Sequence, residues 1–107
     1  MKNDVDERNA RIESTMLGIE DHGIFTSFVY LEWESAGIGF GGYVLGGQSG
    51  IDFIKEILDV VGVGKWEDLK GKYVRVETDG LGSPCNGIGN ILKDKWIYPK
   101  EFFNERS

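Results

Sequence analysis

The most regular pattern of hydrophobic and polar residues covers residues 24–33 (IFTSFVYLEW) and is typical of a β-strand. Strand side chains alternate between two faces, so Val29 and Leu31 share one face. Phe28 and Tyr30 share the other, and both faces are largely apolar. We therefore expect a helix to cover the first face and a second subunit to cover the other.

Four further segments also favour strands, because β-branched and apolar residues alternate there between turn-forming residues. They span residues 11–19, 38–45, 72–78 and 87–92. Turns at residues 20–23 (EDHG) and 34–37 (ESAG) would join the first three strands into an antiparallel meander. Residues 1–9 alternate in charge sign and predict a disordered tail, whereas residues 79–86 predict a loop.

Apolar residues spaced three and four apart predict one amphipathic helix over Ile51–Val61. Its apolar stripe comprises Ile51, Ile54, Ile57, Leu58 and Val61. We expect Ser49 to cap its N-terminus and Gly62 to end it in the left-handed conformation. Leu58 should be fully buried against the inner face of the sheet. That face is expected to present Val29, Leu31, Val74 and Val76.

Together these elements predict an α+β fold. Two short helical turns, at residues 65–71 and 99–103, complete the pattern. The fold is expected to be a single domain over residues 10–107, since 107 residues suit one domain. It should hold a mostly antiparallel five-stranded sheet in the order strand, strand, strand, helix, strand, strand. One helix would pack on one face of that sheet.

The charge of the chain is −6 and is unevenly distributed. No Lys or Arg occurs between Ile12 and Ile54. An acidic half cannot neutralise phosphates, so direct binding of nucleic acid is not expected. The acidic surface either serves solubility or engages a basic partner or a cation. No apolar run approaches the ~20 residues that span a bilayer, and the charged N-terminus does not resemble a signal peptide, so we expect a cytoplasmic protein without membrane contact.

Glycine is abundant, with 16 residues, and alternates in the segment GIGFGG at residues 37–42. This segment is not a dinucleotide-binding fingerprint, because no helix follows it directly. One interpretation is a strand whose glycines let a neighbouring backbone or ring pack closely. The other is a strand that a flat ligand approaches beside Phe40 and Tyr43.

Catalytic chemistry finds little support in the sequence. His22 and Cys85 are each the only residue of their type, so an internal disulfide and a two-histidine site are both excluded. Neither has a partner nearby in sequence to form a nucleophile–base pair. We expect a protein that is not an enzyme and that uses no cofactor and no metal. The residues that could bind a small ligand are Gly39, Phe40, Gly41, Tyr43, His22, Arg75, Lys93 and Trp96.

Four segments resemble a group of small proteins encoded by tailed phages and prophages. They are LGIEDHGIF (17–25), GFGGY (39–43), WEDLKG (66–71) and GIGNILKDKW (87–96). The resemblance spans most of residues 14–98 and implies an accessory role in a host cell, with no catalytic residue to transfer. In that setting the protein would act in the host cytoplasm and counter host defence.

Two functions fit these observations. The first is a non-catalytic protein that sequesters a small nucleotide-like ligand. The second is an acidic inhibitor that binds a basic host protein, such as a nucleic-acid-processing or defence enzyme. Either protein would form a homo-oligomer, expected to be a dimer, through the sheet face that carries Phe28, Tyr30, and Phe40 or Tyr43.

Overall fold

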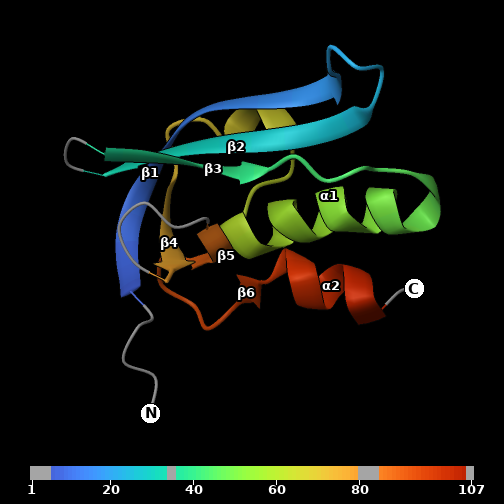
Figure 1. Cartoon of the computed structure of the whole chain (residues 1–107). Coiled ribbons are helices and arrows are strands. Elements are labelled where there is room, and N and C mark those ends of the chain that lie inside the picture. Colours follow the sequence, from blue (N-terminus) through green and yellow to red (C-terminus); the bar gives the residue numbers. More distant parts are fainter. Residues whose placement is uncertain (1–5, 34–35, 80–84, 106–107) are drawn as a thin grey trace.

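A computed structural model describes residues 6–33, 36–79 and 85–105 of the chain (Figure 1). Its strands are β1 (Asp6–Ile19), β2 (Phe25–Trp33), β3 (Ala36–Gly41), β4 (Tyr73–Thr78), β5 (Cys85–Asn90) and β6 (Trp96–Ile97). Its helices are α1 (Gly47–Val61), the 3₁₀ turn η1 (Trp66–Asp68) and α2 (Pro99–Glu105). None of the helices in these described parts is long and apolar enough to cross a membrane.

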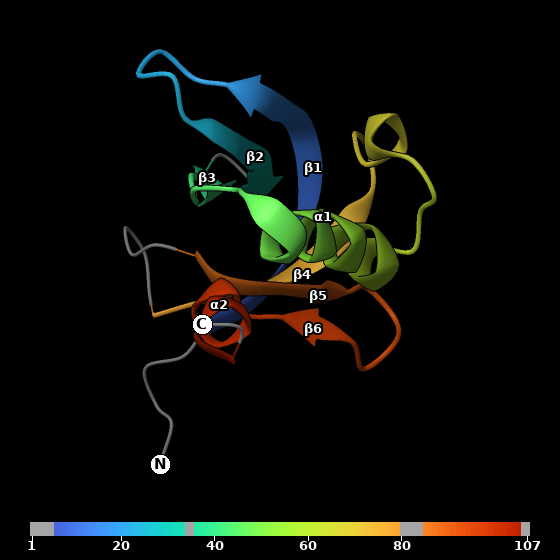
Figure 2. The same ribbon diagram turned by 90° about the vertical axis from the view of Figure 1, so that its right-hand side faces the viewer.

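The strands form one antiparallel sheet in the order β3-β2-β1-β4-β5-β6. β1 joins its two halves, because its C-terminal part pairs with β2 and its N-terminal part pairs with β4. The register of β1 against β2 shifts between Ile12 and Ser14. The two halves of the sheet curve around α1, which lies on the inner face (Figure 2). The predicted α+β architecture is therefore confirmed.

The sheet has six strands rather than the predicted five. The additional strand is β6, in which Ile97 pairs with Ile88 and Trp96 pairs with Gly89. Its two residues are too few for an alternating pattern to be visible in the sequence. Only the pairing with β5, which lies beside it in space, makes this short segment a strand.

β1 also begins earlier than the pattern predicts. It starts at Asp6, inside the segment 1–9 that was predicted to be a disordered tail. Backbone pairing with β4, beginning with Asp6 opposite Thr78, holds these charged residues in a strand. Residues 1–5 lie outside the described residues. Tertiary pairing has thus prevailed over a local sequence with little strand propensity.

The core lies between α1 and the inner face of the sheet. The four predicted contact residues Val29, Leu31, Val74 and Val76 are all buried in one cluster with α1. The face that α1 buries is rotated from the predicted one, however. Its buried residues are Gly50, Phe53, Ile57 and Val60. Ile51 is 56% exposed and Leu58 is only half-buried, so the predicted full burial of Leu58 is wrong.

Aromatic packing explains the rotation of α1. Phe53 was absent from the predicted stripe, yet its ring is fully buried and contacts several other rings. Their centroids lie 4.8–6.3 Å away, in Phe40, Tyr43, Phe102 and Phe103. The last two belong to α2, as predicted for a final turn that closes the core. This cluster turns Phe53 inward and leaves Ile51 outside.

The ends of α1 agree only in part with the prediction. Gly62 follows the last turn with φ 92°, and its N–H donates a hydrogen bond to the Leu58 carbonyl, as predicted. The N-terminus differs, because the helix starts at Gly47 and its N-cap is Gly46. Ser49, the predicted cap, lies in the first turn.

Two strand boundaries also differ from the sequence-based ranges. The predicted strand 38–45 is β3 over Ala36–Gly41, and residues 42–45 continue beside β2 as an irregular segment. The predicted strand 87–92 is β5 over Cys85–Asn90, and residues 91–94 form a turn. Parts of the predicted turn 34–37 and loop 79–86 lie outside the described residues.

Candidate functional site

The eight residues predicted to bind a ligand lie in three parts of the fold. His22 is in the turn between β1 and β2, with 83% of its side chain exposed. Gly39, Phe40 and Gly41 belong to β3, and Tyr43 follows it. The remaining three, Arg75, Lys93 and Trp96, lie in or beside β4 and β6, in the other half of the sheet.

Two of the three β3 residues predicted to bind a ligand, Phe40 and Gly41, serve packing within the chain. The Phe40 side chain is 2% exposed and stacks against Phe53, so no surface ligand reaches its ring. A Cβ at Gly41 would overlap the Ser27 carbonyl, and the backbone there has φ +143°. Gly41 therefore allows the backbone of β2 to approach closely. Tyr43 packs against Phe53 as well, so neither Phe40 nor Tyr43 contributes to an outer sheet face.

Arg75 forms hydrogen bonds with the chain's own backbone. Its Nε and Nη2 donate hydrogen bonds of 2.8 Å to the carbonyls of Asn90 and Lys93. Its guanidinium also lies 4.9 Å from the centre of the Trp96 ring, and Nη1 lies 3.8 Å from a Glu7 oxygen. Arg75, Lys93 and Trp96 are thus brought together as predicted. Their contacts, however, hold the turn between β5 and β6 in place.

Neither His22 nor Cys85 is placed for catalysis. Burial raises the pKa of the Cys85 thiol to about 12, so the thiol stays protonated and weakly nucleophilic at neutral pH. His22 Nδ1 lies 3.2 Å from a carboxylate oxygen of Glu20, and this hydrogen bond lowers the pKa of Glu20. Glu20 also accepts hydrogen bonds from the backbone N–H groups of His22 and Ile24, so it shapes the turn. No group of three or more metal-ligating side chains occurs in the described parts of the chain.

An apolar groove lies between the β1–β2 hairpin and the first turns of α1. We call it the hairpin groove; its volume is about 380 Å³. It is lined by Phe25, Leu45, Gly46, Gly47, Gly50, Ile51, Ile54 and Lys55. The hairpin projects away from α1 toward its turn (Figures 1 and 2).

Exposed apolar side chains continue from the hairpin groove onto the hairpin. Ile19 lies opposite Phe25 in the ladder, hence on the same face, and is 66% exposed. Val44, next to the lining residue Leu45, is 72% exposed. Other large apolar residues of this region with more than a third of their surface exposed are Leu17, Ile24, Phe25 and Ile51. Most large apolar side chains elsewhere in the described residues are buried.

Acidic residues lie close in the sequence to this apolar surface. Glu20 and Asp21 form the hairpin turn, and Asp52 follows Ile51 on α1. Lys55 is the one base among the lining residues, and its methylene stem adds apolar surface. The groove is thus lined by apolar side chains, glycines and one base, and the acidic residues lie close to its lining residues in the sequence.

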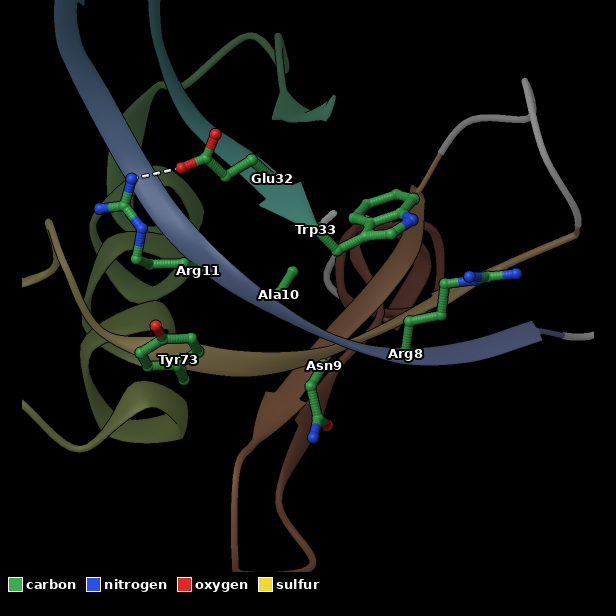
Figure 3. Close-up of a pocket in the computed structure, with 7 residues that line it drawn as sticks. All are labelled: Arg8, Asn9, Ala10, Arg11, Glu32, Trp33 and Tyr73. Carbon is green, nitrogen blue, oxygen red and sulfur yellow. Dashed lines mark hydrogen bonds and ion pairs between the residues drawn. The ribbon is translucent and has the colours of Figure 1, made fainter. Parts of the chain in front are cut away.

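A second cavity lies where β2 separates from β1. We call it the arginine pocket; its volume is about 530 Å³. It is lined by Arg8, Asn9, Ala10, Arg11, Glu32, Trp33 and Tyr73 (Figure 3). Arg11 turns toward Glu32 and forms an ion pair with it, while Arg8 points away from Arg11 (Figure 3). Arg11 and the ring of Tyr73, which lie opposite each other in the ladder between β1 and β4, are compatible with an anionic ligand that carries a ring.

Sequence reasoning missed both cavities. The arginine pocket depends on where β1 leaves β2, which is a property of the register. The hairpin groove had one visible signal, since no charged residue occurs between Glu34 and Asp52. Part of that uncharged run, from Leu45 to Ile51, lines the groove.

Searches against protein-family models, curated proteins and solved structures find no match to this chain.

Proposed function

We propose that this chain is a non-catalytic binding protein that holds a segment of a partner protein in the hairpin groove. The observation that carries the proposal is the gathering of exposed apolar side chains around that groove. Soluble proteins rarely leave large contiguous apolar patches open, and such patches commonly mark interaction sites.

Charge identifies the chemistry of the partner. A segment with an apolar anchor fits the floor of the groove, and Lys or Arg beside that anchor would face Glu20, Asp21 and Asp52. Complementary charge accelerates association and selects the correct partner. The resemblance to phage proteins supports a basic host protein as this partner and inhibition as the outcome.

Designed peptides that carry the expected chemistry of the partner test this proposal. A peptide of alternating Leu and Lys should bind, and a Leu and Glu peptide of the same length should not. Ile51→Glu should weaken the Leu–Lys binding at least tenfold, because it places a charge in the apolar floor. Leu92→Glu is the matched control, since Leu92 is exposed but lies in the turn between β5 and β6.

Salt provides a second readout of the same binding. Affinity for the Leu–Lys peptide should fall as ionic strength rises, because exposed charge pairs are screened. Equal binding of both peptides, or equal loss in Ile51→Glu and Leu92→Glu, would contradict the proposal.

The arginine pocket supports a second candidate, the sequestration of a small nucleotide-like ligand. Arg11, which lies opposite Tyr73 in the ladder, would attract a phosphate, and Tyr73, which is 58% exposed, offers a ring for stacking. Adenosine monophosphate should then raise the melting temperature more than inorganic phosphate does. Tyr73→Ala should remove the difference between the two. If the nucleotide causes no shift at millimolar concentration, this candidate is excluded.

A further inference from the structure

β3 is an end strand of the sheet and, among the described residues, pairs only with β2. The sheet order places β3 at one end and β6 at the other. β6 has only two residues, and Lys95 stands directly before it. β3 has six residues, AGIGFG, and carries no charge and no proline. Natural edge strands usually carry a charge, a proline or a bulge that prevents pairing with another chain. β3 has none of these devices, and its pairing with β2 shows no shift in register.

The hydrogen-bond pattern shows which groups this edge presents. The N–H of Gly42 donates to the Ser27 carbonyl, which fixes the alternation of the ladder between β2 and β3. Ile38 and Phe40 therefore bond to β2, and the N–H and C=O groups of Gly37 and Gly39 point away from it. Both glycines are exposed. Such a row of donors and acceptors matches the spacing of another β-strand.

The interior of the chain gives no reason for a glycine at position 39. A Cβ there would meet nothing nearer than Phe28, at 3.8 Å, and the backbone is not left-handed. A glycine in a strand interior often marks the close approach of another backbone or ring. Gly87 shows the alternative within this chain, since a Cβ there would lie 2.6 Å from the Tyr98 ring. The space at Gly39 lies on the outer face, beside the Phe28 and Tyr30 rings, and no described residue fills it, so a side chain can be introduced there without disturbing this subunit.

We propose that β3 pairs antiparallel with β3 of a second copy of this chain. A two-fold axis at Ile38 would let Gly37 bond to Gly39 of the partner subunit, and the reverse. Charge restricts where a second copy can bind. Two chains of net charge −6 repel each other, and this repulsion is weakest for a contact between uncharged segments. β3 lies in the uncharged run between Glu34 and Asp52. A two-fold pairing joins the β3 edge of one subunit to the β3 edge of the other, so neither β3 edge is left to bind a third copy.

The proposed dimer is independent of the hairpin groove. None of the residues that line the groove belongs to β3. Beside the joint, the Phe28 and Tyr30 rings stack with centroids 5.5 Å apart on the outer face, where Tyr30 is 40% exposed. The contact would thus extend the sheet through its edge, and no subunit would have to cover its outer face.

Gly39→Lys is the variant that tests the edge. The side chain has space, and its charge would lie diagonally across the two-fold axis from the same charge of the partner subunit, where the two repel. Gly18→Lys is the matched control, because Gly18 is also a strand glycine and a Cβ there would meet nothing within 4 Å. At micromolar concentration, sedimentation should give wild type and Gly18→Lys twice the mass of one chain. Gly39→Lys should give the mass of one chain, with an unchanged melting temperature and unchanged binding of the Leu–Lys peptide.

A cysteine at the axis tests the register. Residues that face each other without hydrogen bonds in antiparallel strands have Cα atoms about 4.5 Å apart, within the range for a disulfide. Ile38→Cys should therefore form a cross-linked dimer under mild oxidation, whereas Val44→Cys should not. The native thiol of Cys85 is buried and should leave wild type uncross-linked.

Three results would overturn the proposal: a monomeric wild type, a Gly39→Lys variant that stays dimeric, or an open-ended series of larger assemblies. If the wild type is monomeric, the alternative is that β3 pairs with an extended segment of a different protein.

Discussion

The indole ring of Trp96 lies face-on against Gly89, in the space where any other residue would carry its Cβ. A Cβ at Gly89 would be 2.6–2.8 Å from three atoms of that ring. Tyr98 covers Gly87 in the same way, and the two rings are nearly parallel with centroids 5.8 Å apart. Two aromatic side chains thus cover the two glycines of the neighbouring strand.

This relationship predicts that Gly89→Ala destabilises the fold by about 1–3 kcal/mol, because the methyl group must displace the Trp96 ring. Gly18→Ala is the control, since a Cβ there meets nothing within 4 Å, and it should be neutral or slightly stabilising. Denaturant unfolding followed by tryptophan fluorescence measures both. Equal stability of the two variants would show that the ring does not need the space.

The buried face of α1 predicts a difference between adjacent residues. Ile57 is 1% exposed, so Ile57→Ala should cost about 2–5 kcal/mol of the free energy of unfolding. Leu58→Ala should cost less, because Leu58 is only half-buried. Denaturant midpoints compare the two directly. A larger loss for Leu58→Ala would restore the helix orientation expected from the sequence.

The burial and raised pKa of Cys85 predict that its thiol reacts slowly with alkylating reagents in the native protein. Iodoacetamide at pH 8 should modify the native protein much more slowly than the unfolded chain. The unfolded chain also loses its thiol proton first, near the ordinary pKa of 9.0. The contribution of Cys85 to stability is therefore complete below that pH and is lost as the pH rises toward about 12. Rapid modification of the native protein would contradict the burial.

The hydrogen bond between Glu20 and His22 predicts a contribution to stability that is lost at low pH, whereas that of Cys85 is lost at high pH. The hydrogen bond with His22 lowers the pKa of the Glu20 carboxyl below its usual 4.5. Its contribution to stability is thus present above that value and is lost as the pH falls through the lowered one. An NMR titration of the carboxyl should show the low midpoint, and His22→Ala should raise it. An unchanged midpoint in that variant would remove His22 as the cause.

The elements with strong local signals could be predicted from the sequence. Alternation over residues 24–33, the EDHG turn and the Gly62 helix end all depend on nearby residues, and the structure agrees. Features that depend on distant pairing could not be predicted. Asp6 is in a strand only because Thr78 lies opposite, and β6 exists only because β5 does. The rotation of α1 likewise follows from rings on β3 and α2 that surround Phe53.

The candidate site was harder to predict for the same reason. Residue type alone indicated Phe40 and Arg75 as ligand contacts, but the fold uses the first in its core and the second to hold a turn. Phe25 is on the same face of β2 as Val29, because strand residues four apart share a face. It is 42% exposed and lines the hairpin groove, and this depends on where α1 packs, which the local sequence does not show.

The most direct test of the hairpin groove as the binding surface is an NMR titration of the labelled protein with the Leu–Lys peptide. Our account predicts that chemical shift changes gather on Phe25, Leu45, Ile51 and Ile54, and that Ile51→Glu abolishes them. Changes centred on Arg11 and Tyr73 instead, or no changes at millimolar peptide, would contradict it.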